Sequence, residues 1–138
     1  MTASSIFGIA WLSLAVALAA HVIDEALTDF LSVHNPTVLQ IRARFPWIPL
    51  PVFSFRLWIS GLIAGVLLLF LLSPLALRGV RWIVVAALPL SAMMIANGCG
   101  HIGSSIYLRR WMPGVYSSPL LIAASVFTLV CALRLHCQ

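Results

Sequence analysis

Apolar residues dominate four long segments of the chain, and polar residues gather in the shorter stretches between them. Each segment contains the roughly 20 apolar residues that a helix needs to cross a bilayer. The pattern predicts an all-α integral membrane bundle of four transmembrane helices, in which helices that are adjacent in the sequence run in opposite directions. The expected spans are residues 5–31, 52–77, 80–107 and 117–135.

The stretch between the first two spans is long enough to hold a short helix of its own. Asn35 is suited to be an N-cap and Pro36 to occupy the first helical position. Residues 37–44 carry apolar side chains on one side and polar ones elsewhere, but they are too few to cross a membrane. We therefore expect a short helix in the membrane interface, followed by the proline-rich turn segment 45–51.

Composition supports this membrane interpretation. Hydrophobic residues make up 62% of the chain and charged residues only 8%, whereas a soluble domain has roughly 25% charged residues. The length allows one transmembrane domain over residues 1–138. The net charge of +5 comes from eight arginines without any lysine. These arginines stand singly or in pairs between apolar segments, which favours interface anchors and excludes a nucleic-acid-binding surface.

The few acidic residues are concentrated at one place. Asp24, Glu25 and Asp29 are the only three in the chain, and all lie inside the first apolar segment, just after His21. His21 and Glu25 are one helical turn apart and share a face, which Asp24 and Asp29 flank. An ionisable residue in a membrane span costs several kcal/mol unless it is paired or hydrated, so this cluster indicates a functional site.

The third segment carries a second polar cluster. Asn97 and His101 are one turn apart, and Ser104 and Ser105 follow. The first and third spans are expected to run in the same direction, with His21 about ten and His101 about eight residues before the ends of their spans. At ~1.5 Å per residue, the two histidines lie at nearly the same depth. We expect His21, Glu25, Asn97 and His101 to converge on one cavity.

Three interpretations of this cavity remain open. The first is a metal site for zinc or iron, with His21, Glu25 and His101 as ligands and Asp24 or Asp29 as a further ligand or a partner that orients a histidine. The second is metal-free acid/base chemistry by the same residues. The third is a polar network that only fixes the register of the helices. In the first two, Glu25, Asp24, His21 and His101 are the catalytic candidates, and Asn97 and Ser104 are substrate-binding candidates.

The quoted residues resemble the HXXEE family of small bacterial membrane proteins. The motif reads His21-Val22-Ile23-Asp24-Glu25, with Asp24 in place of the first glutamate. Asn97-x-x-x-His101 and the later run Arg109-Arg110-Trp111-Met112-Pro113-Gly114 are also similar to that family. The resemblance implies a site at these residues and a bacterial cytoplasmic membrane. It does not imply a particular reaction.

Taken together, these features favour a membrane-embedded enzyme that acts on an apolar, lipid-like, isoprenoid or polyketide substrate delivered from the membrane. Hydrolysis, cyclisation or isomerisation would suit metal-assisted or acid/base chemistry in such a cavity. The alternative is a proton- or ion-coupled transporter, or an accessory membrane subunit that binds a ligand. Because four spans are few for a transporter, that alternative requires a homo-oligomer.

The arginines predict the orientation in the membrane. Five of them lie in the loops between spans one and two and between spans three and four or at the edges of these loops, and three lie on the other side. The side with more arginines is expected to face the cytoplasm, so both termini face outward. Cysteines placed at Thr2 or Arg44, in a chain without its native cysteines, can be labelled with an impermeant maleimide from each side. Labelling of position 2 only from inside would contradict this orientation.

Overall fold

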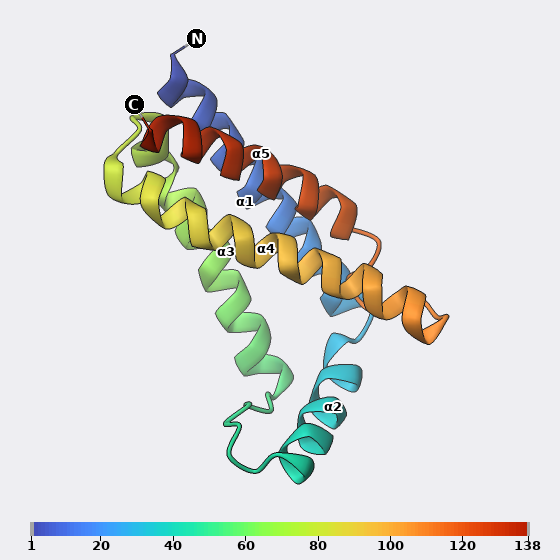
Figure 1. The fold of residues 1–138 in the computed structure, drawn as a ribbon. Helices are drawn as coiled ribbons and strands as arrows, with labels where there is room; N and C mark the ends of the chain where they lie inside the picture. Colours follow the sequence, from blue (N-terminus) through green and yellow to red (C-terminus); the bar gives the residue numbers. More distant parts are fainter. Residues whose placement is uncertain (1, 138) are drawn as a thin grey trace.

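The computed structural model describes residues 2–137 as a chain of α-helices joined by short connections (Figure 1). No strand occurs in that range. The helices are α1 (Ala3–Leu27), α2 (Phe30–Arg44), α3 (Phe55–Leu77), α4 (Arg81–Leu108) and α5 (Ser118–His136).

Four of these helices, α1, α3, α4 and α5, are long and apolar enough to cross a membrane. With 19 to 28 residues each, they indicate an integral membrane protein. The predicted fold class, four spans with a short helix between the first two, is confirmed, and the ends of spans two, three and four lie within three residues of the expected positions.

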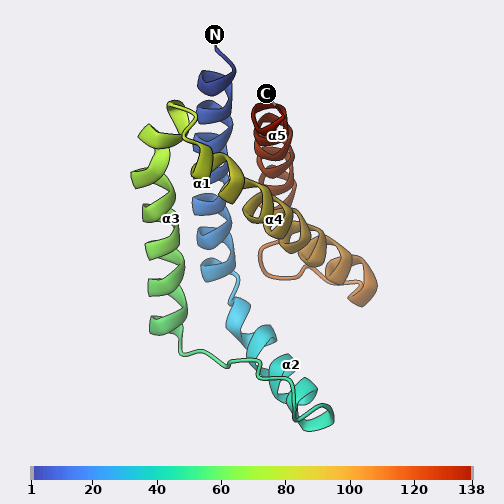
Figure 2. The same cartoon turned by 60° about the vertical axis from the view of Figure 1, so that its left-hand side comes forward.

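The spans alternate in direction, as the short connections require. Both termini lie at one end of the bundle; α1 and α4 run away from that end, and α3 and α5 run back towards it (Figures 1 and 2). α1 packs against α3 and α5, and α4 packs against α5. α3 and α4 are joined by a tight turn at Gly79, which has a φ of +66°, and they diverge beyond it (Figure 2).

An apolar core fills the bundle on the side of the termini. It includes Phe7, Ala10 and Trp11 from α1 and Ile83 and Ala87 from α4, all buried. The indole N–H of Trp11 donates a hydrogen bond of 2.8 Å to a backbone carbonyl of α3, so this large side chain is buried without an unpaired polar group. This packing holds α1 and α4 together near the termini, and the two helices diverge at the opposite end of the bundle (Figure 2).

The start of α2 differs from the sequence-based expectation. The first span ends at Leu27, and α2 begins at Phe30 rather than at Pro36 after an Asn35 N-cap. The break arises because Asp29 adopts a left-handed conformation, with a φ of +55°, which aspartate tolerates better than most residues. The Asn35 side chain instead pairs with the backbone N–H and C=O of Phe53, at 3.0 and 2.8 Å. This pairing holds the segment after α2 against the helix.

Gly8 allows α1 and α3 to approach each other closely. A Cβ atom at this position would lie 2.6 Å from the Leu77 Cα, whereas one at Gly65 would meet nothing within 4 Å. Gly8→Ala is therefore expected to lower the free energy of unfolding by about 1–3 kcal/mol through overpacking. Gly65→Ala, the matched control, should be neutral or slightly stabilising. Denaturation of both variants in detergent tests this, and equal stabilities would contradict it.

Candidate metal centre

The buried face of α1 changes from apolar to polar near the end of the helix. Phe7, Trp11 and Leu14 lie on this face in the core, and His21 and Glu25 continue the same stripe at helical spacing. His21 is 1% exposed and Glu25 is 6% exposed. Because this stripe is directed at the other helices, both polar side chains point into the bundle instead of towards lipid.

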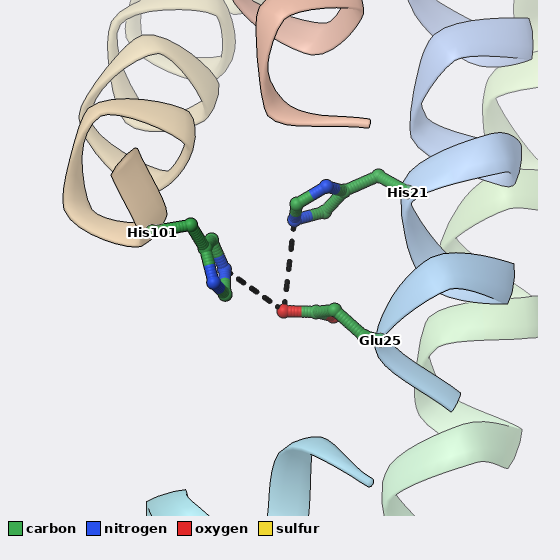
Figure 3. Close-up of side chains that lie close together, drawn as sticks. All are labelled: His21, Glu25 and His101. Atoms are coloured by element: carbon green, nitrogen blue, oxygen red, sulfur yellow. Dashed lines mark ion pairs between the residues drawn. The ribbon is translucent and has the colours of Figure 1, made fainter. Parts of the chain in front are cut away.

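His101 reaches the same point from α4. Its Nε2 lies 3.0 Å from Glu25 Oε1, and the Nε2 of His21 lies 3.6 Å from the same oxygen. The two imidazole rings meet edge to face, with centroids 4.9 Å apart. Figure 3 shows both histidines directed at the carboxylate from different helices. The three side chains thus form one cluster, His21–Glu25–His101.

Two glycines make room for this arrangement. Gly98 allows α4 to press against α5, since a Cβ there would lie 2.7 Å from an Ile122 side-chain atom. Gly114, in the α4–α5 connection, has a φ of +80° and lies directly against the cluster. A Cβ at Gly114 would lie 2.9 Å from the His101 ring and 3.0 Å from the Glu25 side chain. The connection therefore covers one side of the cluster with backbone.

A second set of polar groups surrounds His21. The Asn97 amide nitrogen lies 3.0 Å from His21 Nε2, and the Ser117 hydroxyl lies 2.8 Å from His21 Nδ1. Asp24 Oδ2 accepts hydrogen bonds of 2.8 Å from both the backbone N–H and the hydroxyl of Ser117. Asp24 therefore reaches His21 through Ser117 and does not belong to the cluster itself.

Open space adjoins the cluster on two sides. A cavity of about 430 Å³ lies between α2 and α4 and is lined by His34, His101 and Ser104, among others. An apolar cavity of about 260 Å³ lies among α1, α3 and α4 and includes His21 and Glu25 in its lining. Phe30 and Asn97 line both cavities. The cluster thus lies where a mixed polar cavity meets an apolar one.

The structure brings most, but not all, of the predicted site residues together. His21, Glu25 and His101 come together, Asn97 contacts His21, and Ser104 lines the larger cavity. Asp29 does not join them. It is exposed at the break between α1 and α2 and lies outside the His21–Glu25–His101 cluster. The left-handed backbone at Asp29 ends α1 before that residue can continue its buried face.

Several residues that shape the site were missed in the sequence. Ser117 and Gly114 contact it from a connection, where helical periodicity carries no information, and the Thr28 hydroxyl accepts a hydrogen bond from the Gly114 N–H. Phe30 lies against His101, with ring centroids 5.8 Å apart, and against Trp58, at 5.7 Å. The Pro-Gly pair at the α4–α5 connection was the one available signal, because such a pair marks a turn that needs positive φ.

The donor set suits a divalent metal. One nitrogen from each histidine and one Glu25 oxygen lie within 4.8 Å of one another. Ligand atoms around a tetrahedral zinc ion are roughly 3.3 Å apart when the bonds are about 2.0 Å long. The observed separations of 3.0 and 3.6 Å bracket this value. Two imidazoles and a carboxylate also suit iron.

A comparison with known proteins places the chain in a family. Residues 11–128 match the model of a family described as "Protein of unknown function with HXXEE motif". No curated protein and no solved structure matches the chain. Because the match covers most of the sequence, the chain belongs to the HXXEE family, and His21, Asp24 and Glu25 stand at its motif.

Proposed function

We propose that the protein is a membrane-embedded, metal-dependent enzyme that acts on an apolar, lipid-delivered substrate. His21, Glu25 and His101 would hold a zinc or iron ion. Three protein ligands leave room for water or substrate, as in catalytic metal sites. A bound ion would supply Lewis-acid activation for hydrolysis, cyclisation or isomerisation. The observation that carries the proposal is the convergence of these three donors beside open space.

The negative charge of Glu25 favours a metal-binding role for the cluster over a purely structural polar network. All eight arginines are exposed, and among residues 2–137 only His21 and His101 have a side-chain nitrogen at ion-pair distance from the Glu25 carboxylate. A buried carboxylate in a span is costly unless something neutralises it. The available partners are a proton or a cation held by the two imidazoles, and a divalent ion satisfies all three groups at once.

The surroundings of the cluster favour an enzyme over a transporter. A transporter needs a water path from its site to both membrane faces, whereas an enzyme needs a pocket that is closed at one end. Towards the termini, Leu14 and Ala17 of α1 form a buried apolar cluster with Leu121 and Ala124 of α5. The smaller cavity extends to Leu18 and Met94, which pack against this cluster. A cavity that ends at a buried apolar cluster is the arrangement expected of an enzyme pocket.

The apolar cavity suggests how a substrate arrives. Leu18, Leu62 and Met93 contribute to its lining, and it lies where α3 and α4 diverge (Figure 2). A gap between two membrane-spanning helices faces lipid. In this proposal an apolar molecule enters there from the bilayer and places its polar end in the larger cavity beside His34 and Ser104. This supports a lipid-like substrate class.

Metal-free acid/base chemistry is the second candidate. The His101 Nε2–Glu25 Oε1 distance of 3.0 Å is short enough for direct proton transfer between the two side chains. This arrangement would use the same pocket and substrate class. The two candidates differ in one measurable property, which is whether the purified protein retains a stoichiometric metal ion.

Metal analysis tests the leading proposal. Purified protein is supplied with zinc or iron, desalted and analysed for metal content. The wild type should retain close to one ion per chain, and His21→Ala and His101→Ala should lose it, because a site with three protein ligands tolerates no loss. Glu25→Gln keeps the side-chain volume but should bind metal more weakly. His136→Ala, at the exposed end of α5, is the control and should behave as the wild type does.

The possible results separate the candidates. Unchanged metal content in both histidine variants would contradict the metal site. A wild type that retains no metal would leave acid/base chemistry as the better proposal.

Binding of the substrate's polar end in the larger cavity can be tested by filling that cavity. Gly100 lines it, and a Cβ there would meet nothing within 4 Å, so Gly100→Leu should occupy the cavity without strain. Gly103, which is equally open but outside the lining, gives the control Gly103→Leu. A fatty alcohol with a diazirine near its hydroxyl group, photolysed in nanodiscs, should label cavity residues such as Met112 in the wild type and in Gly103→Leu. Labelling should fall several-fold in Gly100→Leu; equal labelling in all three would contradict this binding site.

A further inference from the structure

Both ring nitrogens of His21 have a hydrogen-bonding partner. Nδ1 lies 2.8 Å from the Ser117 hydroxyl, and Nε2 lies 3.0 Å from the Asn97 amide nitrogen. A neutral imidazole has one N–H donor and one acceptor nitrogen. The partner of the N–H must therefore accept a hydrogen bond, and the partner of the other nitrogen must donate one. The identity of the protonated nitrogen therefore depends on what Ser117 and Asn97 do with their own hydrogens.

Asp24 determines the role of Ser117. The Ser117 hydroxyl donates to Asp24 Oδ2 at 2.8 Å, and the Ser117 backbone N–H donates to the same oxygen at 2.8 Å. An ionised carboxylate can only accept. With its hydrogen directed at Asp24, the Ser117 oxygen is left as an acceptor for an N–H at His21 Nδ1.

Asn97 requires the same protonation from the other side of the ring. Its amide nitrogen can only donate, so His21 Nε2 must accept. Nε2 is also the nitrogen that lies 3.6 Å from Glu25 Oε1. Two neighbours thus place the hydrogen on Nδ1 and leave Nε2 unprotonated, with its lone pair accepting from Asn97 in this structure.

The position of Ser117 in the chain supports a dedicated role. It is the residue immediately before α5, where a serine usually caps the helix through its hydroxyl. Here the side chain makes no such capping bond, and Pro119 at the second helical position removes one of the N–H groups that it could have capped. The hydroxyl instead forms hydrogen bonds with Asp24, which lies 93 residues earlier in the sequence, and with His21, which lies 96 residues earlier.

We infer that Asp24 and Ser117 form a relay that holds His21 in its Nδ1–H tautomer. Ser117 is then a positioning residue, which keeps Nε2 unprotonated, so that a ligand of the cluster could bind there in place of the Asn97 hydrogen bond. The relay replaces the direct carboxylate–histidine contact that commonly orients metal-binding histidines. It also gives the Asp24 of the motif a role that differs from that of Glu25. Only the consequence for metal affinity rests on the proposed function; the tautomer does not.

Nitrogen NMR tests the tautomer directly. Metal-free protein labelled with ¹⁵N-histidine is studied in micelles at a pH where the histidines are neutral, and the His21 signals are assigned by their loss in His21→Gln. The wild type should show a protonated Nδ1 and an unprotonated Nε2 at His21. Ser117→Ala should shift His21 towards the Nε2–H form, because the acceptor at Nδ1 is gone. Ser117→Thr keeps the hydroxyl and should retain the wild-type tautomer.

Ser118→Ala is the matched control. Ser118 is the next residue and is buried, but its hydroxyl donates to the Gly114 carbonyl and not to His21, so its loss should leave the His21 signals unchanged. An Nε2–H tautomer at His21 in the wild type would overturn the inference, even if Ser117→Ala did not fold. An unchanged tautomer in folded Ser117→Ala would overturn it as well.

Zinc titration separates this inference from the proposed function. If both hold, zinc affinity should fall about 10- to 100-fold in Ser117→Ala and stay unchanged in Ser118→Ala. A wild type with the Nδ1–H tautomer that binds no zinc would support the relay and contradict the metal site. If His21 carries its hydrogen on Nε2 in the metal-free protein and the protein nevertheless binds zinc, the relay is contradicted and the metal site is kept.

Discussion

The arrangement of the site depends on one buried carboxylate, that of Glu25, which lies in a membrane span without an arginine beside it. Among the described residues, the only side-chain nitrogens at ion-pair distance from it belong to two imidazoles on different helices. Burial of this charge is expensive unless it is neutralised, so α1 and α4 must present both histidines to the same oxygen. Any ligand of the site, whether a proton or a metal ion, is bound where it cancels this charge.

The packing of the bundle serves that requirement. Close approaches at Gly8 and Gly98 fix α1 against α3 and α4 against α5, and the core near the termini holds α1 and α4 at one end. At the other end the two helices separate, and the space between them is bridged by side chains and by the connection at Gly114. The same divergence creates the cavities beside the cluster, so the geometry that assembles the site also gives access to it.

The sequence predicted the features that follow from periodicity and depth. Apolar length located the four spans, and helical spacing placed His21 with Glu25 and brought His101 to their level. The sequence could not locate the residues that act from connections, such as Ser117, because a hydroxyl in a loop has no periodic signal. It also misplaced Asp29, since one left-handed residue ended the helix earlier than hydrophobicity indicated. Backbone conformation at a single residue therefore decided where Asp29 lies.

X-ray absorption at the zinc edge of zinc-loaded wild-type protein is the most direct test of the central claim, that His21, Glu25 and His101 form a metal site. The account predicts about two imidazole nitrogens and one carboxylate oxygen at roughly 2.0–2.2 Å, with the remaining position filled by a light atom. Sulfur scattering at about 2.3 Å would instead assign the ion to cysteines. That result, or a shell without imidazole, would contradict the claim.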